Sequence, residues 1–175
     1  LVRIEREWKA GDTVTLELTP ETTLSVWKEK SRAVERGPLV YALNVKADVK
    51  KVKNTVNPVE QGEYYYEMTP ASPWNYALIQ KPKVKFSEHY KVDLSGTEGE
   101  ISSPWNEKNA PIRIITPAVR VTNWTEYNRM AGPLPYTFMY ALPVTREPEM
   151  IELIPYGCTA LRITQFPMKG QHTAE

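Results

Sequence analysis

The sequence predicts an all-β fold: a two-sheet antiparallel β-sandwich of the jelly-roll type, with short helices or none. Apolar and polar residues alternate over many short runs, which is the period of a strand with one buried face. Proline is frequent, at 15 of 175 residues, and with the glycines it interrupts every longer run. No segment has the spacing of a three-turn amphipathic helix. The length fits a single domain over residues 1–175.

The first part of the chain predicts a hairpin, an extended run and a buried strand. Residues 2–19 alternate on both sides of a turn at 9–12, which contains Gly11 and Asp12, and this is typical of a hairpin. A further extended run covers 23–27 and leads into a charged connection. The run 39–43 is continuously apolar and follows Gly37-Pro38. It therefore predicts a central strand that is buried on both faces.

The remaining strands are shorter and are separated by proline-containing turns. Residues 46–53 are charged and fit a solvated edge strand or a loop, whereas 95–104 is polar and predicts a long surface loop. Pro117 interrupts an alternating run and predicts a bulge or an edge position there. The other expected strands cover residues 64–68, 74–79, 84–86, 112–121, 138–142, 151–154 and 161–164.

Composition and charge exclude several classes of function. The 22 Lys and Arg residues nearly cancel the 21 Asp and Glu residues, so we expect no nucleic-acid partner. No apolar stretch approaches the roughly 18 to 20 residues that a membrane span needs. The N-terminus lacks the pattern of a signal peptide, and a start at Leu1 indicates a processed chain or a piece of a longer one. One cysteine, Cys158, excludes an internal disulfide and a multi-cysteine zinc site.

A search for catalytic and ligand motifs finds none, and we expect no cofactor and no metal. A phosphate-binding glycine loop, a nucleophile elbow and a His-Glu-x-x-His motif are all missing from the sequence. His89 and His172 lie far apart in the chain. Cys158 has no visible base beside it, so we interpret it as a small buried residue. An acid/base pair needs two carboxylates that face each other across a cleft. The candidates are more typical of solvated loop or strand-edge positions: Glu63, Glu67, Asp93, Glu98 and Glu107.

Three tryptophans in loop-like contexts are the candidate binding residues. Trp74, Trp105 and Trp124 each neighbour an asparagine or a glutamate. An exposed ring beside such groups can stack on the apolar face of a sugar while its neighbours bond the hydroxyls. The alternative is that the rings cover the ends of the core or pack against a neighbouring domain. For Trp74 we expect burial, because residues 75–79 lead directly into a strand.

Four phrases, taken together and in this order, resemble a known family. They are Ile4-x-Arg6-x-Trp8-x-x-Gly11-Asp12-x-Val14-x-Leu16, then Arg36-Gly37-Pro38-Leu39-Val40-Tyr41-Ala42-Leu43, then Ser72-Pro73-Trp74-Asn75-Tyr76-Ala77-Leu78, and finally Leu153-Ile154-Pro155-Tyr156-Gly157-Cys158-Thr159-x-Leu161-Arg162-Ile163-Thr164-x-Phe166-Pro167. The chain resembles the C-terminal β-sandwich region of the β-L-arabinofuranosidase-like proteins, glycoside hydrolase family 127 and its relatives. The second phrase is the most specific, and residues 87–108 are the least characteristic.

The resemblance implies a non-catalytic accessory region that follows an (α/α)6 catalytic barrel. In that family the barrel holds a zinc-bound cysteine nucleophile with further cysteine and glutamate ligands, and a glutamate acid/base. None of that motif set occurs in this sequence, so no catalytic role passes to Cys158. The implied partner is the barrel of the same protein, with a plant-type glycan as a further candidate. The implied location is periplasmic or secreted.

Three hypotheses of function follow from the sequence. The first is an accessory β-sandwich that supports the barrel, which predicts an exposed apolar patch. The second is a self-standing carbohydrate-binding module, which predicts coplanar exposed tryptophans beside polar loops. The third is an independent glycosidase that uses paired carboxylates, and it requires two of them to face each other across a cleft.

Overall fold

The structure is a computed structural model, and it describes residues 3–80, 85–97, 103–136 and 142–170. Its described part is mostly β, as predicted. The longest helix there is α1 (Pro58–Gln61), and the other helical segments are single 3-10 turns. Among these residues no helix is both long enough and apolar enough to cross a bilayer. The expected strand 138–142 falls outside the described residues except for Leu142. Of the strand expected at 84–86, residue 84 lies outside them; the strand is wrong for the other two, because Lys85 is irregular and Phe86 begins the 3-10 turn η2.

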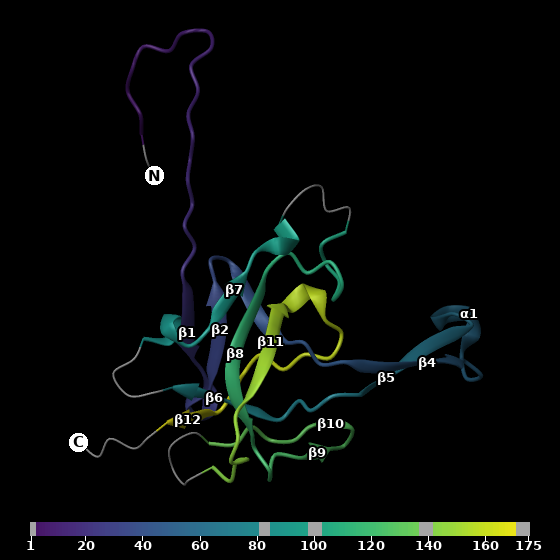
Figure 1. Cartoon of the computed structure of the whole chain (residues 1–175). Helices are drawn as coiled ribbons and strands as arrows, with labels where there is room; N and C mark the ends of the chain where they lie inside the picture. Colours follow the sequence, from purple (N-terminus) through teal and green to yellow (C-terminus); the bar gives the residue numbers. More distant parts are fainter. Residues whose placement is uncertain (1–2, 81–84, 98–102, 137–141, 171–175) are drawn as a thin grey trace.

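Most strands belong to one eight-stranded, curled sheet (Figure 1). Its order along the hydrogen-bonded path is β1-β2-β3-β11-β8-β6-β12, and β7 pairs with β8 beside β6. All neighbours are antiparallel except β12, which runs parallel to β6. The strands are β1 (Thr22–Val26), β2 (Arg32–Arg36), β3 (Leu39–Leu43), β6 (Tyr76–Gln80), β7 (Lys91–Asp93), β8 (Arg113–Arg120), β11 (Glu149–Pro155) and β12 (Met168–Gly170).

Two small sheets and four 3-10 turns complete the described chain. A two-stranded ribbon, β4 with β5, projects from the body and has α1 at its tip (Figure 1). A second pair, β9 with β10, lies beside the main sheet. The bounds are β4 (Ala47–Lys53), β5 (Tyr64–Pro70), β9 (Glu126–Tyr127), β10 (Met130–Ala131), η1 (Lys28–Lys30), η2 (Phe86–Glu88), η3 (Ser95–Thr97) and η4 (Tyr156–Cys158).

The curled sheet closes on itself through the segment that precedes β12. Arg32 in β2 and Phe166 exchange two backbone hydrogen bonds, of 2.8 and 2.9 Å. The backbone N–H of Leu43 in β3 donates to the carbonyl of Ile163 at 2.8 Å. All-β character is therefore confirmed, and the two facing layers of the predicted sandwich are parts of one sheet that curls until its ends meet.

The strand predicted at 161–164 is wrong, because this stretch is irregular. Its alternation has another cause: Leu161 and Ile163 both pack against the main core, while Arg162 is exposed. Alternation of apolar and polar residues indicates that one side of a segment is buried. In this segment one side is buried although its residues form no paired ladder with a strand. The last described strand is β12 instead, three residues long.

The strand predicted at 39–43 is present as β3, between β2 and β11. Tyr41, Ala42 and Leu43 are buried, but Leu39 is only half-buried and Val40 is 39% exposed. The expectation of a central strand is confirmed, and the expectation of burial on both faces holds for its second half. Val40 lies on the outer side of the sheet, at the bottom of a groove that leaves part of its side chain exposed.

Pro117 lies within β8, a strand that has neighbours on both sides. On one side it pairs with Met150 of β11. On the other side, β7 pairs with β8 only up to Ile115, and β6 begins to pair at Ala118. Proline lacks a backbone N–H and disrupts a continuous ladder. Here it falls in the gap between two partner strands, so the sheet tolerates it.

The N-terminal hairpin predicted over 2–19 is wrong as a paired structure. Its turn does form: the Asp12 N–H donates to the Lys9 carbonyl at 3.0 Å, and the Asp12 carboxylate accepts the Lys9 N–H at 2.9 Å. The flanking residues, however, make no strand, and this segment extends away from the body (Figure 1). Val14, Leu16 and Leu18 are exposed there. The alternation created an apolar face, and the described chain offers no sheet to cover it.

The main core is built from the inner face of the curled sheet and from the closing segment. Phe166 is fully buried and packs in one cluster with side chains of β2, β3, β6, β8 and β11. The cluster members are Val34, Tyr41, Leu43, Val45, Tyr76, Leu78, Phe86, Ile114, Ala118, Ile151, Leu153, Phe166 and Met168. A smaller cluster adjoins it around Val119, Val121 and Trp124.

The Phe166→Ala change tests whether the closing segment holds the sheet together. We expect a loss of about 3–5 kcal/mol in the free energy of unfolding, as for other buried phenylalanines. Urea unfolding followed by tryptophan fluorescence measures it. The matched control is Leu16→Ala in the exposed N-terminal segment, with an expected change within about 0.5 kcal/mol. Equal, small effects of both changes would contradict the proposed role of the closure.

Two core tyrosines should make the fold sensitive to alkali. Burial raises the pKa of Tyr41 to about 12, and burial together with the hydrogen bond to Glu149 raises that of Tyr76 to about 12, both from an ordinary 10. The unfolded chain therefore loses these protons first as the pH rises. Stability due to the neutral hydroxyls is complete below pH 10 and is lost between 10 and 12.

The Tyr41→Phe variant separates the contribution of one hydroxyl. The Tyr41 hydroxyl is buried and accepts or donates no hydrogen bond within the described residues, so its removal should cost little at neutral pH. We expect the free energy of unfolding to fall less steeply above pH 10 in this variant than in the wild type. Urea unfolding at a series of pH values measures both slopes. If the free energy of unfolding falls equally steeply above pH 10 in both proteins, the Tyr41 hydroxyl does not contribute to the loss of stability.

Candidate functional site

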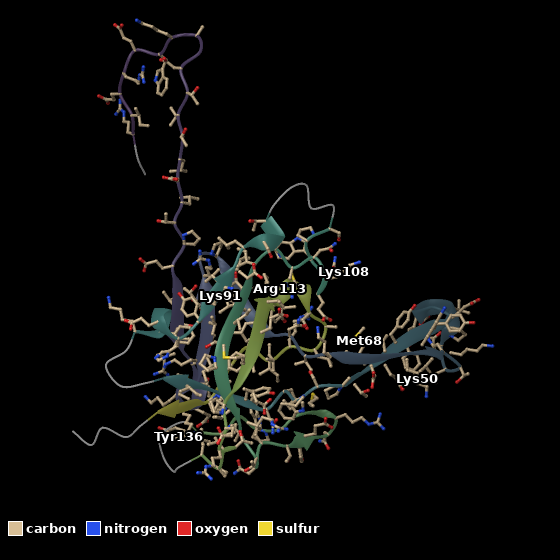
Figure 2. All side chains as sticks on the ribbon, in the orientation of Figure 1. Lys50, Met68, Lys91, Lys108, Arg113 and Tyr136 are labelled. Carbon is tan, nitrogen blue, oxygen red and sulfur yellow. The ribbon has the colours of Figure 1, made fainter. Side chains whose placement is uncertain are left out.

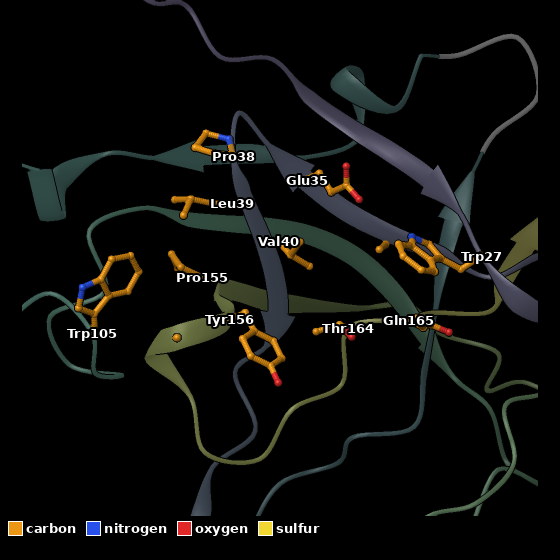
Figure 3. A pocket seen from close by; sticks show the side chains of 12 residues that line it. Trp27, Glu35, Pro38, Leu39, Val40, Trp105, Pro155, Tyr156, Thr164 and Gln165 are labelled. Carbon is orange, nitrogen blue, oxygen red and sulfur yellow. The ribbon is translucent and has the colours of Figure 1, made fainter.

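The candidate site is a groove of about 500 Å³ on the outer side of β2 and β3, next to η4 (Figure 3). Three aromatic residues line it, and all are about half exposed: Trp27, Trp105 and Tyr156. Trp105 and Trp27 lie at its two ends (Figure 3). Within the described part of the chain, Glu35 is the charged residue of its lining. The groove thus combines large apolar rings with one carboxylate.

Trp27 is held in place by a short chain of hydrogen bonds at the end of β1. Its backbone N–H donates to the Ser31 carbonyl at 3.0 Å, which closes the turn around η1. The indole Nε1–H donates to Ser25 Oγ at 2.8 Å, and the Ser25 hydroxyl donates to Glu35 Oε1 at 2.5 Å. Ser25 and Glu35 lie on the paired strands β1 and β2. The ring and the carboxylate are therefore fixed relative to each other.

Trp105 and Tyr156 are positioned by the turn η4 that follows β11. A Cβ added at Gly157 would lie 3.0 Å from Trp105 Cε3, so the glycine lets this indole lie closer to the turn than another residue would. The Arg162 guanidinium stacks over the Tyr156 ring at 4.5 Å, and its Nε donates to the Tyr156 carbonyl at 3.3 Å. The Pro-Tyr-Gly sequence thus supplies one ring and makes room for another.

Cys158 ends the same turn but is directed into the protein. It is 4% exposed, and its thiol donates to the Pro104 carbonyl at 3.3 Å. Burial raises the pKa of this thiol above its ordinary value, despite the opposing charge of Arg113. A nucleophilic cysteine needs the opposite shift, because the thiolate is the reactive form. The expectation of a buried, packed cysteine agrees with this environment.

Several carboxylates of the described chain are engaged in structural contacts. Glu152 accepts hydrogen bonds from Asn44 and, at 2.9 Å, from Arg113. Glu149 accepts a 2.7 Å bond from the Tyr76 hydroxyl and pairs with Arg120. Arg113 and Arg120 belong to the neighbouring strand β8, Tyr76 belongs to β6 beyond it, and Asn44 directly follows β3. The contacts therefore join the strands across the sheet and its edge.

The carboxylates singled out from the sequence have separate local roles. Asp93 accepts the Ser95 N–H at 2.9 Å, which lowers the pKa of its carboxyl. Glu107 forms an ion pair with Lys46, and Glu63 and Glu67 lie on the projecting ribbon. Glu98 lies outside the described residues. In the described ranges no three His, Cys, Asp or Glu side chains gather as a metal ion would require.

The three predicted tryptophans do not form one platform. Trp124 is 4% exposed and donates its Nε1–H to the Gly132 carbonyl at 3.0 Å. Trp74 is half-buried and packs edge-on against Trp124, with ring centroids 5.1 Å apart at 75°. Only Trp105 of the three is largely exposed, at 57%. The burial expected for Trp74 is partial, and the coplanar row is wrong because two of the rings stack into the core.

Sequence reasoning missed the two rings that Trp105 does join. Trp27 ends an extended run and precedes three charged residues, and the sequence therefore predicts it as the last residue of a strand. Tyr156 has no role in the sequence analysis beyond its place in the fourth family phrase. Two sequence features could have indicated these rings: the Ser25-x-Trp27 spacing on a strand and the Pro-Tyr-Gly turn. Neither indicates that both rings face one groove, because Trp27 and Tyr156 are brought together only by the sheet.

Comparisons of the chain with protein-family models, with curated proteins and with solved structures find no match.

The different burial of Trp124 and Trp105 predicts unequal effects of their removal on stability. Trp124→Ala should lower the free energy of unfolding by about 3–5 kcal/mol, because it removes a buried ring and the partner of Trp74. Trp105→Ala should change it by about 0.5 kcal/mol or less, as for an exposed side chain. Thermal and urea unfolding of the two variants provide the comparison. A larger loss for Trp105→Ala than for Trp124→Ala would contradict this placement.

Proposed function

We propose that this chain is a non-catalytic β-domain that packs against the (α/α)6 barrel of a β-L-arabinofuranosidase-like glycoside hydrolase. The observation that supports docking is the groove with Trp27, Trp105 and Tyr156 exposed along it. Large rings that a folded protein holds at its surface are typical anchors of protein interfaces. The identity of the partner comes from the four phrases that resemble the β-sandwich region of this family.

The walls of the groove favour a protein surface. Between the rings lie Pro38, Leu39, Val40 and Pro155, which offer no side-chain hydrogen-bonding groups. Glu35 stands at the margin, and one of its oxygens already accepts the Ser25 hydroxyl. An apolar centre with a polar margin is the usual arrangement of an interface. Apolar side chains of a barrel helix would fill such a groove.

The N-terminal segment provides a second surface that needs a cover. Val14, Leu16 and Leu18 lie on one side of an extended stretch and are all more than half exposed. Alternation of this kind is favourable when the apolar side faces a sheet or a neighbouring domain. Together with the groove, this exposed apolar side supports the proposal that the chain packs against another folded domain.

A second candidate function is carbohydrate binding at the same groove. Trp105 and Tyr156 are exposed beside Glu35, Thr164 and Gln165, and rings with such polar neighbours suit a sugar ring. The lining includes a carboxylate, and no cation faces it among the described lining residues. This chemistry favours a neutral sugar over an anionic one. It differs from the predicted module, since the rings are Trp27, Trp105 and Tyr156.

Binding to a separately purified (α/α)6 barrel of a β-L-arabinofuranosidase-like enzyme tests the proposal. We expect association by isothermal titration calorimetry, weakened at least about tenfold by Trp105→Ala or Tyr156→Ala, as for interface anchors. The control is Tyr127→Ala, an exposed ring on β9 outside the groove, with unchanged affinity. We also expect no turnover of a chromogenic β-L-arabinofuranoside by the chain alone.

Two outcomes would contradict the proposal. Turnover by the isolated chain that is lost in Cys158→Ala or in a carboxylate variant would make it an enzyme. Binding of a neutral oligosaccharide that is lost in Trp105→Ala, with no affinity for the barrel, would favour the second candidate. Because Trp105→Ala should leave the fold intact, a loss of binding reports on the groove itself.

A further inference from the structure

The β4–β5 ribbon has no sheet partner among the described residues. It projects from the body as a two-stranded sheet, and its side chains, such as Lys50 and Met68, lie along both sides of it (Figure 2). Every residue of β5 is exposed. Isolated two-stranded sheets are only marginally stable in water, and a long apolar edge is a template for another strand.

The tip of the ribbon is nevertheless rigidly built. Asn54 is 8% exposed and its amide donates to the carbonyls of Asn57 and Gly62. Its side-chain oxygen accepts the backbone N–H groups of Val56 and Asn57. A single side chain thus satisfies four backbone groups of the turn. The ribbon is held in a defined shape that exposes both of its edges.

The hydrogen bonds at its two ends decide which backbone groups face outward. The Asn54 N–H donates to the Glu63 carbonyl, and the Ala71 N–H donates to the Lys46 carbonyl. Bonded and non-bonded pairs alternate along an antiparallel ladder. In the register of this ribbon, the backbone groups of Tyr64, Tyr66 and Met68 therefore point to the free edge of β5. On β4 the corresponding residues are Val49, Lys51 and Lys53.

Charge distinguishes the two edges. β4 contains Lys50, Lys51 and Lys53, and none of them forms an ion pair with the described residues. With three lysines and one aspartate, Asp48, β4 carries a net positive charge, so two copies joined along β4 would bring like net charges together, which is unfavourable. Residues 64–68 of β5 contain one charge, Glu67, between tyrosines and a methionine. The β5 edge is the one that a second copy can approach.

We propose that two copies of this chain associate by antiparallel pairing of their β5 strands, about a twofold axis at Tyr66. In this register Tyr66 faces its own counterpart, Tyr64 faces Met68, and Tyr65 faces Glu67. The Tyr66–Tyr66 and Tyr64–Met68 pairs are hydrogen-bonded pairs, because the backbone N–H and carbonyl groups of these residues point to the free edge of β5. The Tyr65 hydroxyl, which lies 3.5 Å from Glu67 in its own strand, gains the Glu67 of the other copy as a neighbour.

The neighbouring register with its axis at Glu67 is less favourable for two reasons. An axis at Glu67 would set the two Glu67 carboxylates directly opposite each other. It would also pair Tyr64 with Pro70, which has no N–H to donate. The register at Tyr66 avoids both and gives one continuous apolar face of tyrosines and methionines. It also directs the tip of each ribbon, where Val56 and Val59 are 92% and 94% exposed, toward the base of the ribbon of the other copy.

Proline substitutions on the two edges of the full-length chain test the pairing. Proline at position 66 removes an N–H that faces the free edge and leaves the ladder to β4 intact. Analytical ultracentrifugation should show a concentration-dependent dimer for the wild type and a monomer for Tyr66→Pro. The matched control is Lys51→Pro, which removes the outward N–H of the cross-strand partner on the other edge and should remain dimeric.

Cysteine cross-linking tests the register without relying on the proline variants. Directly opposed residues of a bonded pair have Cα atoms about 5.5 Å apart, within reach of a disulfide. Tyr66→Cys should therefore form a covalent dimer on mild oxidation, whereas Tyr65→Cys, displaced by two positions from its counterpart, should form little. The native Cys158 is buried and does not compete.

Three results would overturn the pairing. They are a wild type that remains monomeric at about millimolar concentration, equal cross-linking at positions 65 and 66, or a Lys51→Pro variant that dissociates as Tyr66→Pro does. The proposal does not rest on the barrel-docking function. The groove variants Trp105→Ala and Tyr156→Ala should retain the dimer, so failure of one proposal leaves the other testable.

Discussion

The fold depends on one closing segment, residues 163–170, that ties three strands of the sheet together. Its backbone bonds to Leu43 of β3, to Arg32 of β2 and, through the Pro167 carbonyl, to Leu78 of β6. β2 and β3 are neighbours, whereas β11 and β8 lie between β3 and β6 along the path of the sheet. Their connection brings the two ends of the sheet together, and Phe166 fills the space between them with no exposed surface. Without this segment the inner face of the sheet would lie open to water, and the main core would lose its continuity.

The same closure builds the candidate site on the opposite side. Thr164 and Gln165 belong to the closing segment and form one wall of the groove, while Val40 of β3 forms its floor. Trp27 and Trp105 stand at the two ends, because Trp27 directly follows β1 and the Trp105 indole lies against Gly157 of turn η4. The groove is therefore a consequence of how the sheet closes. A change that loosens the closure should disturb both the core and the groove, whereas a change of an exposed ring should affect the groove alone.

Two features lie outside this closed body, and each leaves strand-forming sequence without a partner. The ribbon keeps its backbone ladder and a locked tip, so its shape survives without the core. The N-terminal segment keeps only its turn. The difference follows from hydrogen bonding: paired strands satisfy their backbone within the ribbon, while the single extended stretch satisfies it with solvent. Both features expose apolar side chains. We therefore propose a catalytic barrel as the partner of the N-terminal segment and a second copy of the chain as the partner of the ribbon.

Sequence alone determined the all-β class, the central strand at 39–43, the strands β5 and β11 and the buried state of Cys158. These follow from local composition, because a continuous apolar run or a proline-limited alternation leaves few other structures. The alternating runs at 2–19 and 161–164 were misread, since a period of two reports a buried side and does not reveal whether another strand is there to pair with it. Trp74 and Trp105 share the local sequence Ser-Pro-Trp-Asn and yet differ in exposure, and Trp124, in the sequence Asn-Trp-Thr, is buried. Only the tertiary structure decided which ring enters the core and which joins Trp27 and Tyr156, because that depends on contacts between residues distant in the chain.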